Sequence, residues 1–398
     1  MSAGLQVAVV GGGIGGLATG LALHRHGIDV TVYEQAPALG EVGAGVQVTP
    51  NSLRLLDRFG LGEEVRRLGV ELDRQRSMYY RMDGTPIAPV LTTDSTGHNS
   101  IYGIHRADLV DVLASGIPAG VVRTGHRCTG LRQSEDAVQL EFENGALVRA
   151  DVVVAADGIH SSLQRHVVEP ARPVDSGSVA YRGLLPAEEV PSWPTDRFEL
   201  WMGAGKHLLV FPVRAGTLIN YVGFVPSDVR AAESWSAPGD PAVLAAAFSG
   251  WDPRIQELLA AVRSTFWWGL YDREPLRRWT DGRVTLLGDA AHPMLPHLGQ
   301  GANQSIEDAI ALSIVLADAT PETAPARLRE YEALRHPRTT AVQAGARANG
   351  LRYDSRYEDL SVRDAELDSV RTFRLSLYDY DVERAALDAR SALQTTAD

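Results

Sequence analysis

A run of glycines at residues 11–16 constrains the fold more than any other feature of the sequence. It follows an apolar run, Val7–Val10, and opens a segment with helical spacing, Ile14–His26, so it predicts a strand, a tight turn and a helix. Such a turn presents backbone N–H groups and the positive end of a helix to the phosphates of a dinucleotide, with expected contacts at Gly11, Gly13, Gly15 and Gly16. Glu34 closes the next strand, where a carboxylate can accept hydrogen bonds from ribose hydroxyls. The motif predicts a dinucleotide site and leaves both NAD and FAD open.

Charge and cysteine content exclude several classes of protein. The 398 residues carry a net charge of −12, and Lys206 is the only lysine, so no basic stripe for nucleic acid is expected. The single cysteine, Cys128, rules out an internal disulfide framework and a two-cysteine redox site. No stretch approaches the ~20 apolar residues of a membrane span. We expect a cytoplasmic protein, a monomer or homodimer, without a metal site.

The pattern of elements predicts an α/β fold with an insertion. Buried-strand patterns at Asp151–Ala156 and Val284–Leu287 continue the Rossmann-like domain, and a long apolar helix is expected at Gln304–Leu316. Asn144-Gly145 predicts a hairpin. The strand-like pieces between about 172 and 270 are separated by Pro and Gly, which indicates an inserted antiparallel sheet. The expected division is a nucleotide-binding domain at 1–75, 105–171 and 271–340, a substrate-binding β-sheet domain at 76–104 and 172–270, and a helical C-terminal segment at 341–398.

Three further motifs decide between the two cofactors. Asp157-Gly158-Ile159-His160-Ser161 and Gly288-Asp289-Ala290-Ala291-His292-Pro293 each follow a buried strand, and His105-Arg106-Ala107-Asp108-Leu109 precedes a helix. With the first motif, they resemble the fingerprints of the single-component (group A) FAD-dependent aromatic hydroxylases, in particular salicylate hydroxylase-like and 3-hydroxybenzoate 6-hydroxylase-like members. The resemblance covers roughly residues 5–340. It implies one non-covalently bound FAD, with NADH or NADPH as a transient co-substrate and O2 as oxidant.

The resemblance also assigns cofactor contacts. It places Asp289 on the ribityl chain, Arg106 near the pyrophosphate and ribityl region, and Asp157 with Gly158 beside both FAD and the nicotinamide nucleotide. One departure is Gln164, where the family often has arginine and this chain has arginine one residue later. A glycine-rich loop before the apolar helix is implied to lie along the flavin. The remaining expected cofactor contacts are Gln47, Pro296, Gly299, Gly301, Ala302 and Asn303.

The expected reaction is hydroxylation of a small phenolic or hydroxybenzoate-like ring through a C4a-hydroperoxyflavin, with decarboxylation as an option if the substrate is salicylate. A base that removes the phenol proton activates the ring, and His207 and His297 are the candidates. The side chains expected at the substrate are Arg182, Trp201, Phe211, Tyr221 and Phe224. For each aromatic member, the competing interpretation is ordinary sheet core.

Two alternatives stay open at this point. One is an FAD-dependent hydroxylase or epoxidase of a larger natural-product ring, such as an indole, terpene or polyketide. The other is a flavin-binding protein without turnover, which nothing in the sequence favours. The helical C-terminus is expected either to cover the FAD domain or to pair two subunits.

Overall fold

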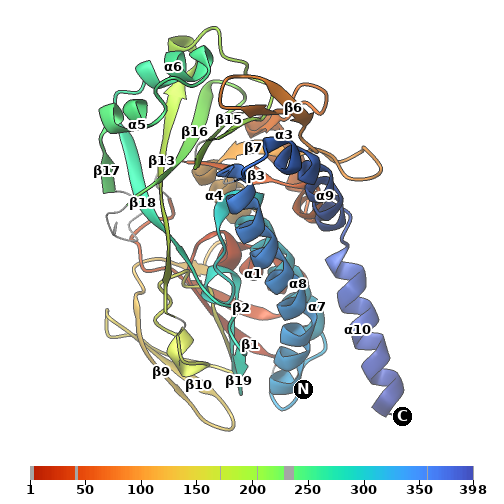
Figure 1. Cartoon of the computed structure of the whole chain (residues 1–398). Coiled ribbons are helices and arrows are strands. Elements are labelled where there is room, and N and C mark those ends of the chain that lie inside the picture. Colours follow the sequence, from red (N-terminus) through yellow and green to blue (C-terminus); the bar gives the residue numbers. More distant parts are fainter. Residues whose placement is uncertain are drawn as a thin grey trace.

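The computed structural model describes residues 4–40, 44–170, 172–203, 205–227, 237–355 and 357–397. Two sheets organise these residues (Figure 1): a six-stranded, mainly parallel sheet near the N-terminus, and an eight-stranded sheet that carries α5 and α6 at the far end of the molecule. No helix within these ranges has the length and apolarity needed to cross a membrane.

The six-stranded sheet forms the predicted nucleotide-binding domain. Only the β19–β20 pair is antiparallel. In spatial order its strands are β19 (Thr280–Asp281), β20 (Val284–Leu286), β12 (Val152–Ala155), β1 (Gln6–Val10), β2 (Asp29–Tyr33) and β8 (Val122–Arg123). Helices α1 (Ile14–Arg25), α4 (Arg106–Ser115) and α7 (Gly301–Leu316) accompany it. The predicted βαβ unit is confirmed, and the predicted apolar helix begins three residues earlier than expected, at Gly301.

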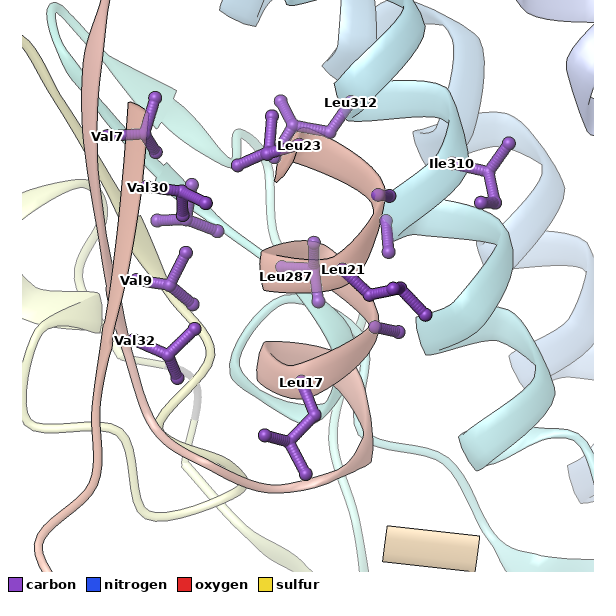
Figure 2. Packing of buried hydrophobic residues seen from close by; sticks show 14 of the residues in the cluster. Val7, Val9, Leu17, Leu21, Leu23, Val30, Val32, Leu287, Ile310 and Leu312 are labelled. Carbon is purple, nitrogen blue, oxygen red and sulfur yellow. The ribbon is translucent and has the colours of Figure 1, made fainter. Parts of the chain in front are cut away.

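Apolar side chains from three layers hold this domain together. Figure 2 shows α1 between the strands and α7; Leu17 and Leu21 of α1 belong to the same apolar cluster as the strand residues Val9 and Val32. All four of these side chains are fully buried. Because both faces of a parallel sheet are covered, its strands read as continuous apolar runs in the sequence.

The eight-stranded sheet is the predicted insertion. Its order is β17 (Ala237–Gly239), β18 (Thr265–Asp272), β13 (Val174–Pro186), β16 (Leu218–Pro226), β15 (Lys206–Val213), β14 (Glu199–Gly203), β5 (Met78–Arg81) and β6 (Pro86–Pro89). The sheet is antiparallel, as predicted, except where β14 and β5 pair in parallel. One face packs against α5 (Pro241–Ala247) and α6 (Pro253–Ala260), and the other face turns towards the nucleotide-binding domain.

Smaller elements link the two sheets. A three-stranded sheet contains β3 (Gly45–Val48), β7 (Tyr102–His105) and β4 (Val70–Glu71). Helices α2 (Pro50–Arg58) and α3 (Gly62–Leu68) connect β3 to β4 along the chain. The segment 76–104 therefore does not belong wholly to the large sheet, because its last strand pairs with β3 and β4. The predicted hairpin is confirmed in a second three-stranded sheet, which contains β9 (Cys128–Gln133), β10 (Val138–Phe142) and β11 (Leu147–Ala150). Short 3-10 turns occupy η1 (Gln164–His166), η2 (Ala187–Glu189), η3 (Gly288–Ala290) and η4 (Pro296–Leu298).

The C-terminal part is helical, as predicted, but its boundary is not at residue 340. Helix α8 (Ala324–Tyr353) runs through that position without interruption. It is followed by α9 (Leu360–Tyr378) and α10 (Val382–Ala397). Val382 and Ala386 of α10 lie in the same apolar core as α1 and α7, so α10 covers the nucleotide-binding domain.

A buried ionic network joins α7, α8 and the third glycine-rich motif, residues 288–293. The Asp308 carboxylate accepts hydrogen bonds from His292 Nε2 at 2.5 Å and from Arg335 Nε at 2.7 Å. The neighbouring Glu307 carboxylate accepts from Arg335 Nη1 at 2.6 Å and Arg338 Nε at 2.7 Å. Burial alone would raise the pKa of Asp308, but His292 and Arg335 lower it to about 2. The two carboxylates, Glu307 and Asp308, therefore stay ionised inside the protein.

Removing the shared cation should destabilise the fold. In Arg335→Met, two carboxylates lose a buried partner, which typically costs about 3–5 kcal/mol. Urea unfolding followed by circular dichroism measures the loss. Arg329→Met, at an exposed position on the same helix, is the control and should change stability by less than about 0.5 kcal/mol. An Arg335→Met protein as stable as this control would contradict a structural role for the network.

Candidate functional site

One cavity runs from the ends of the parallel strands to the inner face of the large sheet. The glycine turn after β1, the loop after β12 and the third motif after β20 line one end. Side chains of β13, β14, β15, β16 and β18 line the other, together with the ends of α8 and α9. In an open parallel sheet, ligands bind beyond the carboxyl ends of the strands, so this is where the fold itself places a cofactor.

The glycines of the first motif are required by close backbone approaches. Gly11 has a φ of +111°, and a Cβ there would lie 2.2 Å from the carbonyl oxygen of Ala156. A Cβ on Gly16 would lie 1.8 Å from the carbonyl oxygen of Gly11, so α1 can meet β1 only through a glycine. Gly13 and Gly15 line the cavity. The two pairs have different tasks: Gly11 and Gly16 shape the turn, and Gly13 and Gly15 face the space that a pyrophosphate needs.

Glu34 lies against the glycine turn. Its two carboxylate oxygens accept hydrogen bonds from the backbone N–H of Gly12 at 2.6 Å and of Ala36 at 2.7 Å. It closes β2 beside the cavity without lining it. This is the position from which a carboxylate reaches a ribose at the edge of the site.

The second motif (157–161), the third motif (288–293) and the arginine motif (105–109) meet at the cavity. Gly158, Asp289 and Arg106 line it. Burial lowers the pKa of Arg106, and the charge of Asp289 opposes that shift. Asp157 accepts a hydrogen bond from the Ser162 N–H at 2.8 Å, and its buried Oδ1 has no hydrogen-bond partner among the described residues. A buried acceptor left without a donor fits a site completed by a ligand.

Gln164, the residue that departs from the family pattern, has a structural partner in the third motif. Its amide Nε2 donates to the carbonyl oxygen of Ala290 at 2.8 Å. The residue therefore ties the second motif to the third, in the place where the family often has arginine.

The loop before α7 presents glycines to the same cavity. Pro296, Gly299, Gly301 and Ala302 line it, as does Gln47 from β3. Gly299 has a φ of +64°, a conformation that a side chain would strain. A Cβ at Gly301 would meet nothing closer than 3.9 Å, so there is open space beside the start of α7.

The expectation that Asn303 faces the cofactor is wrong for its side chain. Its Nδ2 donates to the carbonyl oxygens of Gln47 at 2.9 Å and Gly299 at 2.8 Å, and its Oδ1 accepts from the Thr49 N–H at 3.0 Å. Three bonds to backbone groups use up the amide, and Asn303 is not among the lining residues. It holds the loop in place.

Alternation along the strands separates the predicted aromatic residues. Phe211 and Phe224 line the cavity, as does Arg182, whose guanidinium lies 4.8 Å from the Trp268 ring centroid. Burial, and then the neighbouring charge of Arg106, lower the pKa of Arg182 to about 10.

Trp201 and Tyr221 lie on the opposite face of the sheet, so the prediction that they contact substrate is wrong. Trp201 donates its indole N–H to Asp252 at 2.9 Å, and Tyr221 donates its hydroxyl to the Ser264 carbonyl oxygen at 3.4 Å. Both are fully buried in the core beneath α5 and α6. Successive side chains of a strand point to opposite faces, which places these two rings away from the cavity.

His207 has one ring nitrogen paired and one unpaired. Its Nδ1 lies 2.9 Å from Asp354 Oδ1, while its buried Nε2 has no partner among the residues that the structure describes. The ring lines the cavity and stacks on Phe224, with 4.2 Å between centroids. Burial lowers the pKa of His207, and Asp354 opposes the shift. The imidazole is therefore neutral, and the bond to Asp354 assigns its proton to Nδ1.

His297 lines the same cavity, and its ring is next to that of His207. The ring centroids are 5.1 Å apart, and His297 Nδ1 is also buried without a described partner. Burial, followed by the neighbouring His207, holds the pKa of His297 well below its usual value. The ring fits because α8 carries Gly350, where a Cβ would lie 2.7 Å from it.

Several cavity residues were not anticipated. Leu209, Val222 and Trp268 follow from strict alternation along strands that the sequence did indicate. Tyr353 and Arg374 line the cavity from the C-terminal helices, and Asp354, at the end of α8, bonds His207 without lining it; no local motif marks these three residues.

Three comparisons with known proteins agree with this site. The sequence matches the FAD binding domain family over residues 4–346. It is 39% identical to the 3-amino-4-hydroxybenzoate 2-monooxygenase PtmB3 of Streptomyces platensis, over 91% of this chain and 93% of that protein. It is 34% identical to a salicylate hydroxylase of Pseudomonas putida, over 98% of this chain and 96% of that protein. A solved structure described as a salicylate hydroxylase substrate complex superimposes with a TM-score of 0.84 at 28% identity, covering 97% of this chain and 98% of the other.

The fold, the four sequence motifs and these matches define the class. The chain is an FAD-dependent monooxygenase, and it belongs to the aromatic hydroxylase family. Its residues also fit the cofactor: glycines leave room for a pyrophosphate, and open space adjoins the start of α7.

The two buried histidines should make the protein sensitive to mild acid. Their pKa values are lowered in the folded state, so below about pH 6.5 the unfolded chain binds protons that the folded protein excludes. As the pH is lowered below this value, the free energy of unfolding should decrease by up to about 1.4 kcal/mol per pH unit for each histidine. Urea unfolding of His297→Gln from about pH 7 to about pH 5 should show a shallower decline. The exposed control His98→Gln should follow the wild type, and an unchanged slope in His297→Gln would refute the assignment.

Proposed function

We propose that this protein uses FAD, NADH or NADPH, and O2 to hydroxylate a small phenolic ring of the hydroxybenzoate type. The observation that carries the proposal is the neutral His207, a residue with an unpaired ring nitrogen that lines a cavity continuous with the flavin motifs. The relatives are named for 3-amino-4-hydroxybenzoate and salicylate, both hydroxylated aryl carboxylates. Bound FAD supplies the reducing equivalents that activate O2 for insertion of one oxygen atom.

His207 acts as the general base in this proposal. Its Nδ1–H is donated to Asp354, so the lone pair on Nε2 is available for the proton of a phenol. Removing that proton makes the ring a better nucleophile. Asp354 is a positioning residue: it fixes the tautomer and stabilises the imidazolium that forms, much as a carboxylate does in a catalytic triad.

The aromatic walls keep water from the reacting ring. Phe211 and Phe224 lie on the same face of adjacent strands. Trp268 lines the same cavity from β18, two strands away from β16. The loop before α7 offers backbone N–H groups and the positive end of a helix on the flavin side. An apolar pocket beside a polar cofactor channel favours productive transfer of oxygen over its loss.

A substrate panel tests the proposed function. Purified protein loaded with FAD should oxidise NADH or NADPH faster in the presence of 3-amino-4-hydroxybenzoate, salicylate or 3-hydroxybenzoate, because the bound ring triggers turnover. Product mass reports hydroxylation, with loss of CO2 if decarboxylation accompanies it. If no hydroxybenzoate stimulates oxidation or yields product, the small-ring proposal fails, and larger rings such as indoles, terpenes or polyketides become the next candidates.

His207→Gln tests the base. Loss of general-base catalysis typically costs about 10²–10⁴-fold, so hydroxylation should fall by at least about 100-fold. The flavin spectrum should be retained, because the side chain belongs to the sheet rather than to the cofactor motifs. Exposed His24→Gln on α1 is the control and should match the wild type. Activity near the wild-type rate in His207→Gln would assign the base elsewhere, with His297 as the next candidate.

A further inference from the structure

Arg374 is a buried cation without an acidic partner. It lies on α9, lines the cavity and is 5% exposed. Its Nη1 donates to the Tyr378 hydroxyl and its Nη2 to the Tyr353 hydroxyl, both at 3.1 Å. Its buried Nε has no partner within the described ranges, and no carboxylate there lies within ion-pair distance of it.

Two other buried arginines, Arg335 and Arg363, are neutralised by carboxylates. Arg335 binds Glu307 and Asp308, and Arg363 binds Asp364. Transferring a charge from water to a protein interior is costly unless an opposite charge accompanies it. The neutral hydroxyls around Arg374 solvate the guanidinium without cancelling its charge. An arginine of this kind that lines a ligand cavity is suited to an anionic ligand.

Tyr353 adds a second donor. Its hydroxyl oxygen accepts hydrogen bonds from Arg374 Nη2 and from Asn349 Nδ2 at 3.3 Å. The Tyr79 hydroxyl is 3.5 Å away, longer than a good O–H···O bond. With two N–H groups directed at its oxygen, the hydroxyl has its own proton left to donate. Its ring lies 5.4 Å from that of His207, measured between centroids.

We infer that Arg374 and the Tyr353 hydroxyl form a subsite for the carboxylate of the substrate ring. The inference rests on the proposed function and deepens it, because it restricts the substrate to aryl carboxylates. The carboxylate binds at the α8–α9 end of the cavity, and the phenol hydroxyl turns towards His207. Arg182, the cavity arginine that the sequence suggested, is stacked on Trp268 and adjoins Arg106 on the flavin side.

Binding without turnover tests the subsite. FAD-loaded protein, without NADH or NADPH, is titrated with salicylate and 3-hydroxybenzoate and with their neutral carboxamides, and binding is read from the flavin absorbance change or by calorimetry. In Arg374→Met, the carboxylates should bind about 30-fold more weakly or worse, the usual result of truncating one partner of a buried charge pair. The carboxamides should change by less than about threefold, since they carry no charge for the arginine to bind.

Two further variants keep the test decisive. Tyr353→Phe should weaken the carboxylates by roughly tenfold through loss of one charged hydrogen bond, without removing the cation. Arg371→Met, at an exposed position on the same helix, is the control and should bind both ligand classes as the wild type does. Thermal melting and the flavin spectrum establish that each variant is folded, and Tyr353→Phe carries the test if Arg374→Met is not.

The outcomes separate this inference from the proposed function. Equal losses for carboxylates and carboxamides, or no loss, would overturn the subsite. A selective loss of carboxylate binding in Arg182→Met alone would move it to Arg182. Carboxylates that bind through Arg374 but are never hydroxylated would leave the subsite standing and sink the proposed reaction, whereas a wild type that binds no carboxylate at all would sink both.

Discussion

Two adjacent carboxylates on α7, Glu307 and Asp308, hold together the parts of the protein on which the site depends. Asp308 binds His292 of the third flavin motif, and both carboxylates bind Arg335 of α8. A buried network of this kind tolerates no missing partner, because each charge left alone would be strongly destabilising. It fixes the motif that meets the cofactor and the helix that continues to the substrate cavity. Helix α8 is therefore tied to the third flavin motif through these carboxylates.

The large sheet divides its side chains between two tasks. In each central strand, one set of alternate residues faces the cavity and the other set packs beneath α5 and α6. His207 and Phe224 are opposite each other across β15 and β16, on the cavity face. Tyr221, three residues before Phe224, must then lie on the other face. Counting parity along the predicted strand would have excluded it from the pocket.

Local signals made the flavin half of the site predictable, and the substrate half depended on tertiary contacts. Each cofactor motif is a short segment with a glycine pattern that can be recognised locally; Gly16, for example, is required because a Cβ there would meet the carbonyl oxygen of Gly11 in the same turn. Arg374, which lines the cavity, and Asp354, which bonds the cavity residue His207, have no such signature, because they take these positions only after α8 and α9 fold across the inner face of the sheet. The domain boundary expected at residue 340 failed for a related reason. Motif resemblance ended there, but α8 continues through it.

Oxygen-isotope labelling tests the central claim most directly. The protein, FAD, NADH or NADPH and a hydroxybenzoate that supports turnover are combined under 18O2, and the product is analysed by mass spectrometry. If flavin and ring meet in one cavity from which water is excluded, each product molecule carries one oxygen atom from O2. A product that takes its new oxygen from water, or complete conversion of O2 to hydrogen peroxide with the ring unchanged, would contradict the account.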